Sequence, residues 1–531
     1  MTESFPPLPD HPPIEPQEVA GGSGDGPEGH GPGPGGISPD RGTPASRWLA
    51  LLAVTLLYLL IAVSQNLTSY MTPPEKQPGR EPQGGEMAKL MMLIERAFEG
   101  AGAPGQFARA AFTQIEASKH PADRLQGVLL LGESEGADKA LEHLKTVRTA
   151  TGQAPRDEQT FPLPTPKWAL VRAPDDPDTG APPPEEKKYV IDKEVILDAE
   201  AMETLYTLGP DQLSDDARAR LVDRYGWLGR LATTPESDTA AREALYDDLP
   251  WAIGFLAMVF ALLVVWGLAG LTMFIIAIVM MATKRLRWRF EAPRPGGSVF
   301  LETFAVFLLG FGLVQVLGVV AARVIADATV VVRLSMAAQW MLLLTLFWPL
   351  LRGVRLSDWR GAVGWTAPNG VFREIAAGVA GYFAGVPILV AGMIMTVLLT
   401  FASAAIFGEP ESPPSNPILE MLQSADFVTI ILLITLATIW APIAEETLFR
   451  GAIYRHLRGR AGVLVCAVVT AFLFAFMHSY GPLMVGPLIA LGVTFAIIRE
   501  WRGSLIGAMT AHCLHNATIM CVMLVAMKAM A

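Results

Sequence analysis

Three short patterns near the C-terminal end of the chain carry the residues best suited to chemistry. They are Glu445-Glu446-Thr447-Leu448-Phe449-Arg450, Phe474-Ala475-Phe476-Met477-His478 and His512-Cys513-Leu514-His515-Asn516. Each lies in an apolar run, where an ionisable side chain is costly and therefore indicates a functional site. A carboxylate and an imidazole can together position and deprotonate a water molecule. A second imidazole and a side-chain amide can donate hydrogen bonds to a developing oxyanion, so the set suits hydrolysis of a peptide bond without a covalent intermediate.

Helical spacing predicts how the side chains within two of these patterns are grouped. Glu446 and Arg450 are four residues apart with the acid N-terminal, so on a helix they share a face and form a structural salt bridge. That pairing leaves Glu445 to face a cavity. His512 and Asn516 are also four residues apart and point the same way.

The three patterns are also expected to meet at one depth. If the helix carrying Glu445 turns near Gly459–Gly462, Glu445 lies about 21 Å before the turn and His478 about 24 Å after it, at 1.5 Å per residue. His512 lies about 13 Å beyond Gly503 by the same rule. We therefore expect one site that opens toward the cytoplasm.

The same residues leave a metal alternative open. The sequence contains no H-E-x-x-H zinc motif. Glu445, His478 and His512 are nevertheless the ligand types of a His2Glu zinc site. No cofactor is certain from the residues, and zinc is the one they suggest.

Composition places this chemistry in a membrane protein. Of 531 residues, 51% are hydrophobic and 17% are charged, against roughly 25% charged in a typical soluble chain. The net charge of −10 is unevenly divided: residues 1–47 hold 7 acids and 2 bases, 66–249 hold 32 and 21, and 250–531 hold 12 and 18. This pattern excludes a purely soluble enzyme, a fibrous protein and a wholly disordered chain. The excess of acid argues against a nucleic-acid partner.

Five segments are expected along the chain. They are a disordered Pro/Gly-rich tail (1–47), a transmembrane anchor (48–65), an extracytoplasmic, mostly helical domain (66–249), transmembrane helices (250–369) and a catalytic membrane domain (370–531). The tail has 11 Pro and 10 Gly, and it cannot bury enough apolar surface to offset its chain entropy. A cleaved signal peptide is the competing interpretation of the first apolar run, but the long acidic tail before it favours an uncleaved anchor.

The fold class expected is an all-α polytopic membrane protein with about nine transmembrane helices and the helical domain inserted after the first. The candidate spans are 48–63, 251–281, 299–322, 335–351, 375–405, 427–448, 463–478, 483–498 and 504–527. Basic residues gather in alternate connections, which are 284–298, 352–373, 450–460 and 499–502. Because positive connections stay in the cytoplasm, we expect a cytoplasmic N-terminus and residues 66–249 outside, in a multi-pass protein of a bacterial cytoplasmic membrane.

The E-E-x-x-x-R, F-x-x-x-H and H-x-x-x-N series, in this order on late membrane helices, resembles the CPBP family. That family includes type II CAAX prenyl endopeptidases and the bacteriocin-processing and self-immunity (Abi) proteins. The resemblance covers roughly residues 370–527, and Gly503-Ser504-Leu505 before the third pattern adds to it. The 66–249 insertion and the acidic tail do not resemble the family core.

The resemblance implies a membrane endopeptidase acting on a protein or peptide substrate, for which a prenylated CAAX tail is one option. It implies that Glu445 and His478 activate the attacking water, and that His512 and Asn516 stabilise the oxyanion or hold a metal. Glutamate- and metal-dependent mechanisms are both compatible with it.

The remaining residues of the first pattern, Glu446 and Arg450, are implied to support the site. Two other function classes stay open: a non-catalytic membrane scaffold or self-immunity protein that keeps the fold, and a transporter that uses these groups as a proton relay. In each case the lipid bilayer is a partner.

Overall fold

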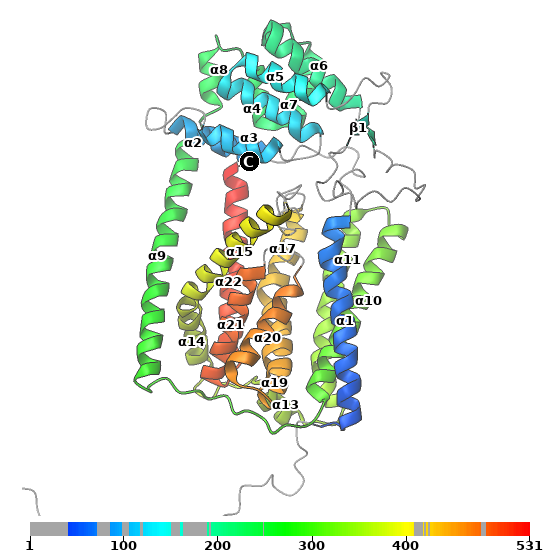
Figure 1. Cartoon of the computed structure of the whole chain (residues 1–531), viewed down its shortest axis with the longest axis vertical. Helices are drawn as coiled ribbons and strands as arrows, with labels where there is room; N and C mark the ends of the chain where they lie inside the picture. The colour runs from blue at the N-terminus through cyan, green and yellow to red at the C-terminus, as the bar shows by residue number, and fades with distance from the viewer. Residues whose placement is uncertain are drawn as a thin grey trace, which may run out of the picture. The chain divides into compact units, whose positions relative to one another are not determined.

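The computed structural model describes most of the chain. The described residues are 41–71, 85–97, 106–116, 121–149, 160–162, 188–190, 193–247, 249–407, 418, 421–422, 425–478 and 485–530. Nearly all of them lie in helices (Figure 1). Residues 1–40 of the predicted tail lie outside this set, so the predicted disorder there stays a prediction.

The chain between the first two apolar helices forms short helices around one core. They are α2 (Gly85–Ala97), α3 (Gln106–Glu116), α4 (Pro121–Glu135), α5 (Ala137–Thr149), α6 (Lys193–Leu208), α7 (Asp215–Thr233) and α8 (Thr239–Ala244). Their apolar faces bury Leu129, Met202 and Leu221 in a shared cluster. Strands β1 (Thr160–Pro162) and β2 (Lys188–Val190) pair antiparallel. The described part of 66–249 is therefore mostly helical, as expected, while its position outside the membrane stays a prediction.

The apolar half of the chain is also helical. Its elements are α1 (Pro44–Met71), α9 (Leu249–Ala282), α10 (Val299–Val324), α11 (Ala328–Met341), the 3-10 turn η4 (Leu342–Phe347), α12 (Trp348–Leu351), α13 (Leu356–Val363), α14 (Val371–Ala384), α15 (Val386–Phe407), α17 (Phe427–Thr435), the π-helical segment η5 (Leu436–Trp440), α18 (Ala441–Glu446), the π-helical segment η6 (Thr447–Ile453), α19 (Tyr454–Arg458), α20 (Val463–Phe476), α21 (Val485–Arg502) and α22 (Ile506–Met530).

Seven stretches of the described residues are long and apolar enough to cross a bilayer. They are Pro44–Val63, Ile253–Ala282, Val299–Val324, Ala328–Leu351, Val386–Ser403, Phe427–Arg458 and Ile506–Val525. The chain is thus an all-α protein with several candidate spans, compatible with a multi-pass membrane protein. The more detailed expectation of nine spans is not confirmed.

Two expected spans account for the difference, and a third is shorter than expected. The run 463–478 is helical only over Val463–Phe476, which is short for a span. The run 483–498 forms α21, which carries charged side chains in its last turn. The run 375–405 divides at Gly385, where a Cβ would lie 2.3 Å from Thr494 Cγ2, so only glycine lets α21 approach this closely.

The turn expected near Gly459–Gly462 is present. Helix α19 ends at Arg458, and Gly462 precedes the first residue of α20. As a result, α20 returns alongside the helix that carries the glutamates, as the depth argument requires.

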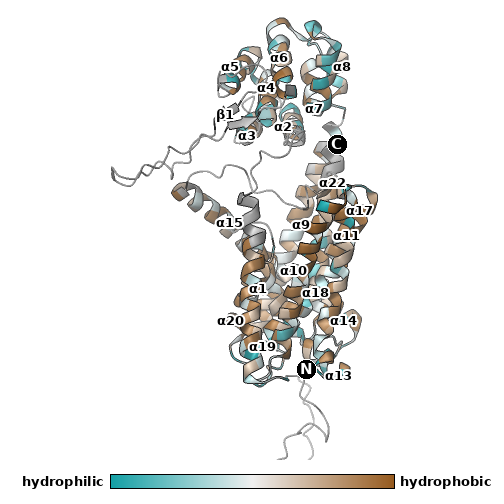
Figure 2. Ribbon diagram, turned by 90° about the vertical axis from the view of Figure 1, so that its right-hand side faces the viewer, coloured by the Kyte–Doolittle hydropathy of each residue, from teal (hydrophilic) through white to brown (hydrophobic). Residues whose placement is uncertain are grey.

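Packing of the apolar helices places α21 among the helices that carry the three patterns. It contacts α15, α20 and α22, while α14 packs against α22 and α1 against α10. A core cluster includes the buried side chains of Phe304, Trp440, Leu448 and Phe474. Many large apolar side chains stay exposed on α1, α9 and α10, as expected where helices face lipid rather than protein. Figure 2 shows the hydrophobic residues along α1.

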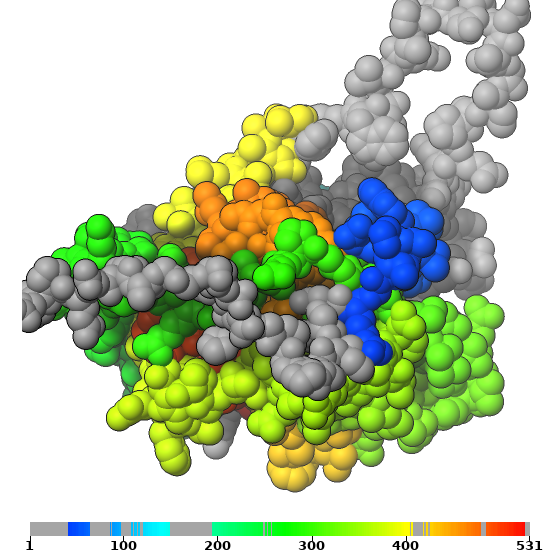
Figure 3. All heavy atoms as spheres, turned by 90° about the horizontal axis from the view of Figure 1, so that it is seen from below, coloured from blue at the N-terminus to red at the C-terminus, as the bar shows by residue number. Residues whose placement is uncertain are grey.

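The connections rich in basic residues gather at one end of these helices. Figure 3 looks onto that end, where the segments 283–298 and 352–370 lie beside the start of α1. The exposed basic residues there are Lys284, Arg285, Arg287, Arg289, Arg294, Arg352, Arg355, Arg360 and Arg373. Exposed positive charge at one end is what the predicted cytoplasmic orientation of these connections requires.

Candidate functional site

Two π-helical segments flank the helical turn that carries the paired glutamates. Within η5 the N–H of Ala441 bonds Leu436 O, five residues back. If this pattern continued, Ala437 O would accept from the N–H of residue 442. That residue is Pro442, which has no N–H. Asn516 Nδ2 on α22 donates to Ala437 O at 2.8 Å instead. The amide therefore satisfies a carbonyl that the proline leaves without a backbone donor.

The expected ion pair between Glu446 and Arg450 is present and fully buried. Arg450 Nη1 donates to Glu446 Oε1 at 2.8 Å, and both side chains are 0% exposed. Arg450 Nη2 also donates to Gly492 O at 3.1 Å, which joins this helix to α21. A buried ion pair is stable only when further groups compensate its desolvation, and the carbonyl supplies part of that compensation.

The faces of aromatic rings also help to compensate for the desolvation of the ion pair. The Arg450 guanidinium carbon lies 4.6 Å from the ring centre of Phe474, 5.2 Å from that of Phe495 and 5.9 Å from that of Phe449. Such cation–π contacts stabilise a desolvated cation by about 2 kcal/mol or more. These rings also exclude water from around the ion pair.

His512 bridges the two glutamates. Its Nδ1 lies 3.0 Å from Glu446 Oε1, and its Nε2 lies 3.9 Å from Glu445 Oε2. The ring stacks on Phe495, with centres 5.1 Å apart and planes 19° apart. Because an ionised Glu446 can only accept, Nδ1 carries the proton of this hydrogen bond, and Nε2 faces Glu445.

Glu445 differs from its neighbour in access and in bonding. Its side chain is 18% exposed, whereas that of Glu446 is 0% exposed. Oε2 of each glutamate is buried without a hydrogen-bond partner among the described residues, but Glu446 is held through its Oε1 by Arg450 and His512. Because Glu445 is the more accessible of the two, its carboxylate is the one that a water molecule can reach.

His478 follows the last turn of α20. Its Nδ1 bonds Phe474 O at 2.9 Å, and since a carbonyl only accepts, Nδ1 is the protonated nitrogen and Nε2 carries the lone pair. Its ring centre lies 4.9 Å from that of Phe474, which in turn lies 5.8 Å from the ring centre of His512. Phe474 thus contacts the imidazoles of both the second and the third pattern.

The structure therefore brings most of the predicted residues together directly. Glu445, Glu446, Arg450 and His512 are linked by the ion pairs above, and His478 reaches them through Phe474. Asn516 is held one helical turn from His512 by its bond to Ala437 O. The meeting of the patterns at one depth is the arrangement the sequence predicted.

The zinc alternative has less support. Among the described residues, no three His, Cys, Asp or Glu side chains are grouped so that they could hold a metal ion. The two nitrogens of His512 face Glu446 and Glu445 rather than a shared centre with His478. The residues do not fit a three-ligand metal site as they stand.

Several contacts were not predictable from the sequence patterns. Phe495 stacks on His512, and Trp365 Nε1 donates to Thr447 Oγ1 at 2.9 Å. His515, outside the family pattern, lies with Nδ1 3.4 Å from Tyr382 Oη. Each contact joins residues far apart in the chain, so no local spacing indicates it.

Two acids that the sequence places in connections are fully buried. Glu374 accepts two hydrogen bonds from Arg502, each 2.8 Å long, and Glu500 pairs with Arg458. Both glutamates are 0% exposed. They join helix ends at the same side of the molecule as the basic connections, where no pattern residue lies.

A serine pattern elsewhere in the chain has no catalytic geometry. Gly132-Glu133-Ser134-Glu135-Gly136 has the letters of a G-x-S-x-G elbow. It lies at the end of α4, where Ser134 Oγ donates to Leu130 O in its own helix. A strand-to-turn-to-helix elbow is absent there, so the pattern does not present a nucleophile.

The helices that carry the site match a known family. Residues 427–518 match the family model described as Rce1-like, Type II CAAX prenyl endopeptidase Rce1-like. The matched range begins at the first residue of α17 and includes all six predicted site residues. The resemblance to the CPBP family is thereby confirmed for this part of the chain, and the match supports a protease-type fold. No curated protein and no solved structure matches the chain.

Proposed function

We propose that the chain is an intramembrane endopeptidase that hydrolyses a peptide bond with water activated by Glu445 and His478. The observation that carries this proposal is a contrast between the two glutamates: Glu446 is fully buried and held by Arg450 and His512, whereas Glu445 is partly exposed and its Oε2 lies beside His512 Nε2. Glu446 is already committed to Arg450 and His512. Glu445 is therefore the acid of the pair that remains available to accept a proton from water.

In the proposed reaction, a water bonded to Glu445 and His478 attacks the carbonyl carbon of the substrate. Glu445 accepts the water proton as the new C–O bond forms. The carbonyl oxygen becomes an oxyanion, which accepts hydrogen bonds from His512 Nε2–H and from the second Nδ2 hydrogen of Asn516. The proton then passes from Glu445 to the departing amine as the C–N bond breaks, giving a carboxylic acid and an amine.

Charge balance supports a proton on His512 Nε2. Glu445 and Glu446 together with Arg450 carry one net negative charge when all three are ionised. An additional proton on His512 Nε2 brings the group to neutrality, which a low-dielectric site favours, and leaves Glu445 a carboxylate that can accept the water proton. In that state His512 donates from both nitrogens, to Glu446 and toward the oxyanion.

The substrate is proposed to be a protein or peptide segment that reaches the site from the bilayer. The name of the matched family model points to a tail that ends in a prenylated CAAX sequence. We place the opening of the site toward the cytoplasm, because the basic connections lie at the end of the helices where α19 turns into α20. In that orientation the N-terminus is cytoplasmic and residues 66–249 lie outside.

Two measurements test this function. Terminal proteomics on cells with wild-type protein or His478→Ala identifies proteins whose length depends on the site. Quenched CAAX peptides, with or without an S-farnesyl group, are then incubated with the purified protein in nanodiscs. We expect cleavage by the wild type and none by His478→Ala at equal folded protein. Asp327→Asn is the control, because asparagine still caps α11.

A non-catalytic scaffold gives the opposite result. In that case no protein changes length, and the cellular phenotype survives His478→Ala.

A further inference from the structure

The N-terminal helix α1 is bonded to α20, the helix that ends just before His478. Tyr58 Oη on α1 donates to Leu473 O on α20 at 3.0 Å, across 415 positions of sequence. Helix α1 lies outside residues 427–518, which match the family model. The bond therefore joins a part of the chain outside the matched region to the proposed catalytic region.

The carbonyl that Tyr58 contacts belongs to the last turn of α20. The final carbonyls of a helix lack intrahelical donors and need other partners. Here the N–H groups of Met477 and His478 both bond Ala475 O. Leu473 O accepts from Tyr58, and the next carbonyl, Phe474 O, accepts from His478 Nδ1. The Tyr58 hydroxyl on α1 thus satisfies the Leu473 carbonyl in the last turn of α20. The next carbonyl, that of Phe474, determines which nitrogen of His478 carries the proton.

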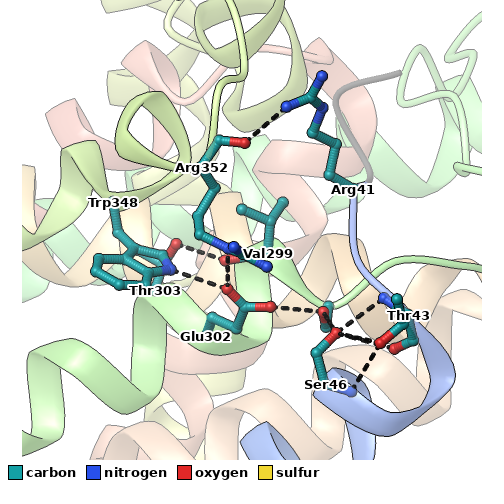
Figure 4. Close-up of polar contacts among 9 residues, drawn as sticks. Arg41, Thr43, Ser46, Val299, Glu302, Thr303, Trp348 and Arg352 are labelled. Carbon is teal, nitrogen blue, oxygen red and sulfur yellow. Dashed lines mark hydrogen bonds and ion pairs between the residues drawn. The ribbon is translucent and has the colours of Figure 1, made fainter. Parts of the chain in front are cut away.

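A polar cluster holds α1 at its other end (Figure 4). Ser46 Oγ lies 2.7 Å from Ser298 Oγ, and Ser298 Oγ donates to Glu302 Oε1 at 2.6 Å. Glu302 Oε2 accepts from Trp348 Nε1 and Arg352 Nε at 3.0 and 2.9 Å. This acid joins α1 to α10 and α12.

The backbone completes the attachment. Arg41 O accepts from the N–H groups of Ser298 and Val299, at 2.8 and 3.1 Å, and thereby caps the start of α10. Tyr58 lies 12 residues beyond Ser46, or about 18 Å along the helix. With its first turn fixed to α10, α1 presents Tyr58 at a defined height against α20, where its ring packs on the cluster containing Phe474.

We propose that Tyr58 is a positioning residue for His478: it holds the last turn of α20 so that Phe474 O keeps His478 protonated on Nδ1. This inference rests on the proposed function only for its effect on turnover. The effect on the imidazole follows from the contacts alone. Helix α1 is then a structural part of the site and not solely a membrane anchor.

The test removes one hydroxyl. Tyr58→Phe keeps the ring and its packing, while Thr55→Val is the matched control, because the Thr55 hydroxyl bonds only within α1, to Leu51 O. Full-length protein labelled with 15N-histidine is studied by NMR in nanodiscs, and His478 is assigned by the signal lost in His478→Gln. We expect the Nδ1–H tautomer in the wild type and in Thr55→Val, and a mixture of tautomers in Tyr58→Phe.

Kinetics provide the second measurement, with the farnesylated CAAX peptide as probe. For Tyr58→Phe we expect kcat to fall about 5- to 10-fold with KM unchanged. A fall of this size corresponds to the loss of one hydrogen bond to a buried carbonyl. The acid limb of the pH–rate profile, where protonation of the His478 imidazole removes the lone pair that binds the water, is expected to move only in this variant.

Unchanged His478 signals in Tyr58→Phe would overturn the inference whatever the activity. If the wild type does not cleave any substrate, the proposed function fails, but the tautomer measurement still decides the role of Tyr58.

Discussion

His512 Nδ1 lies 3.0 Å from Glu446 Oε1, inside a region where both side chains are almost completely buried. This contact joins the first and third patterns and turns the other nitrogen of His512 toward Glu445. It divides the paired glutamates into two roles. Glu446 binds the Arg450 guanidinium and the His512 imidazole. Glu445 is the acid that remains available to accept a proton from water.

Glu446→Gln is expected to destabilise the protein rather than only to inactivate it. The substitution leaves Arg450 buried without its counter-charge, which typically costs about 3–5 kcal/mol. We expect a clear fall in the thermal unfolding temperature of the detergent-solubilised protein. Glu446→Gln combined with Arg450→Met should recover much of that loss without restoring cleavage. A single variant as stable as the wild type would contradict the assigned role of the pair.

Asn516 and Pro442 are expected to be energetically coupled. Asn516→Asp removes the donor to Ala437 O and should cost about 1–3 kcal/mol. In a Pro442→Ala background, residue 442 regains an N–H that can bond Ala437 O, so the same substitution should cost less. A double-mutant cycle on unfolding free energies measures this coupling. Additive effects would show that the amide does not replace the missing backbone donor.

Metal removal is expected to leave turnover unchanged. The described residues hold no three-ligand group, and the proposed reaction uses only Glu445, His478, His512 and Asn516. Activity is compared before and after dialysis against a chelator, together with the zinc content of the purified protein. Loss of activity on dialysis and its return with zinc would contradict the proposed mechanism.

The helical segment before α9 is expected to lose stability in acid. Burial is the main cause that lowers the pKa of His143 on α5 below its ordinary value of 6.5, so the folded state keeps this side chain neutral. The free energy of unfolding keeps its full value above pH 6.5 and declines as the pH falls below it. The reason is that His143 binds a proton more readily in the unfolded chain than in the folded one. Amide hydrogen exchange in α3 and α5 at pH 7.5 and 5.5 measures the change. His143→Leu should reduce the difference, and an equal difference in that variant would contradict this explanation.

The sequence was most informative where the interaction is local. Glu446 and Arg450 are one helical turn apart, so their ion pair followed from spacing, and the turn at Gly459–Gly462 followed from its glycines. Helix existence was also predictable over most of the chain, since long apolar runs fold as helices in lipid. The substitution of a side-chain amide for a backbone donor at Pro442 needed the position of α22, which no local pattern gives.

Tertiary contacts were the part that could not be predicted. Tyr58 reaches Leu473 across more than 400 residues, and Glu374 and Glu500 are buried only because arginines from other segments or turns pair with them. The number of spans was also uncertain, because short helices such as α20 can be apolar without being long enough to cross a bilayer unaided.

The kcat of Glu445→Gln on a cleaved peptide is the most direct test of the central claim. The variant keeps the size and polarity of the side chain, and its folded fraction is checked against Asp327→Asn in the same nanodiscs. We predict a fall in kcat of about 100- to 10,000-fold, the contribution expected of a general base, with KM little changed. A folded Glu445→Gln protein that cleaves at the wild-type rate would contradict the account.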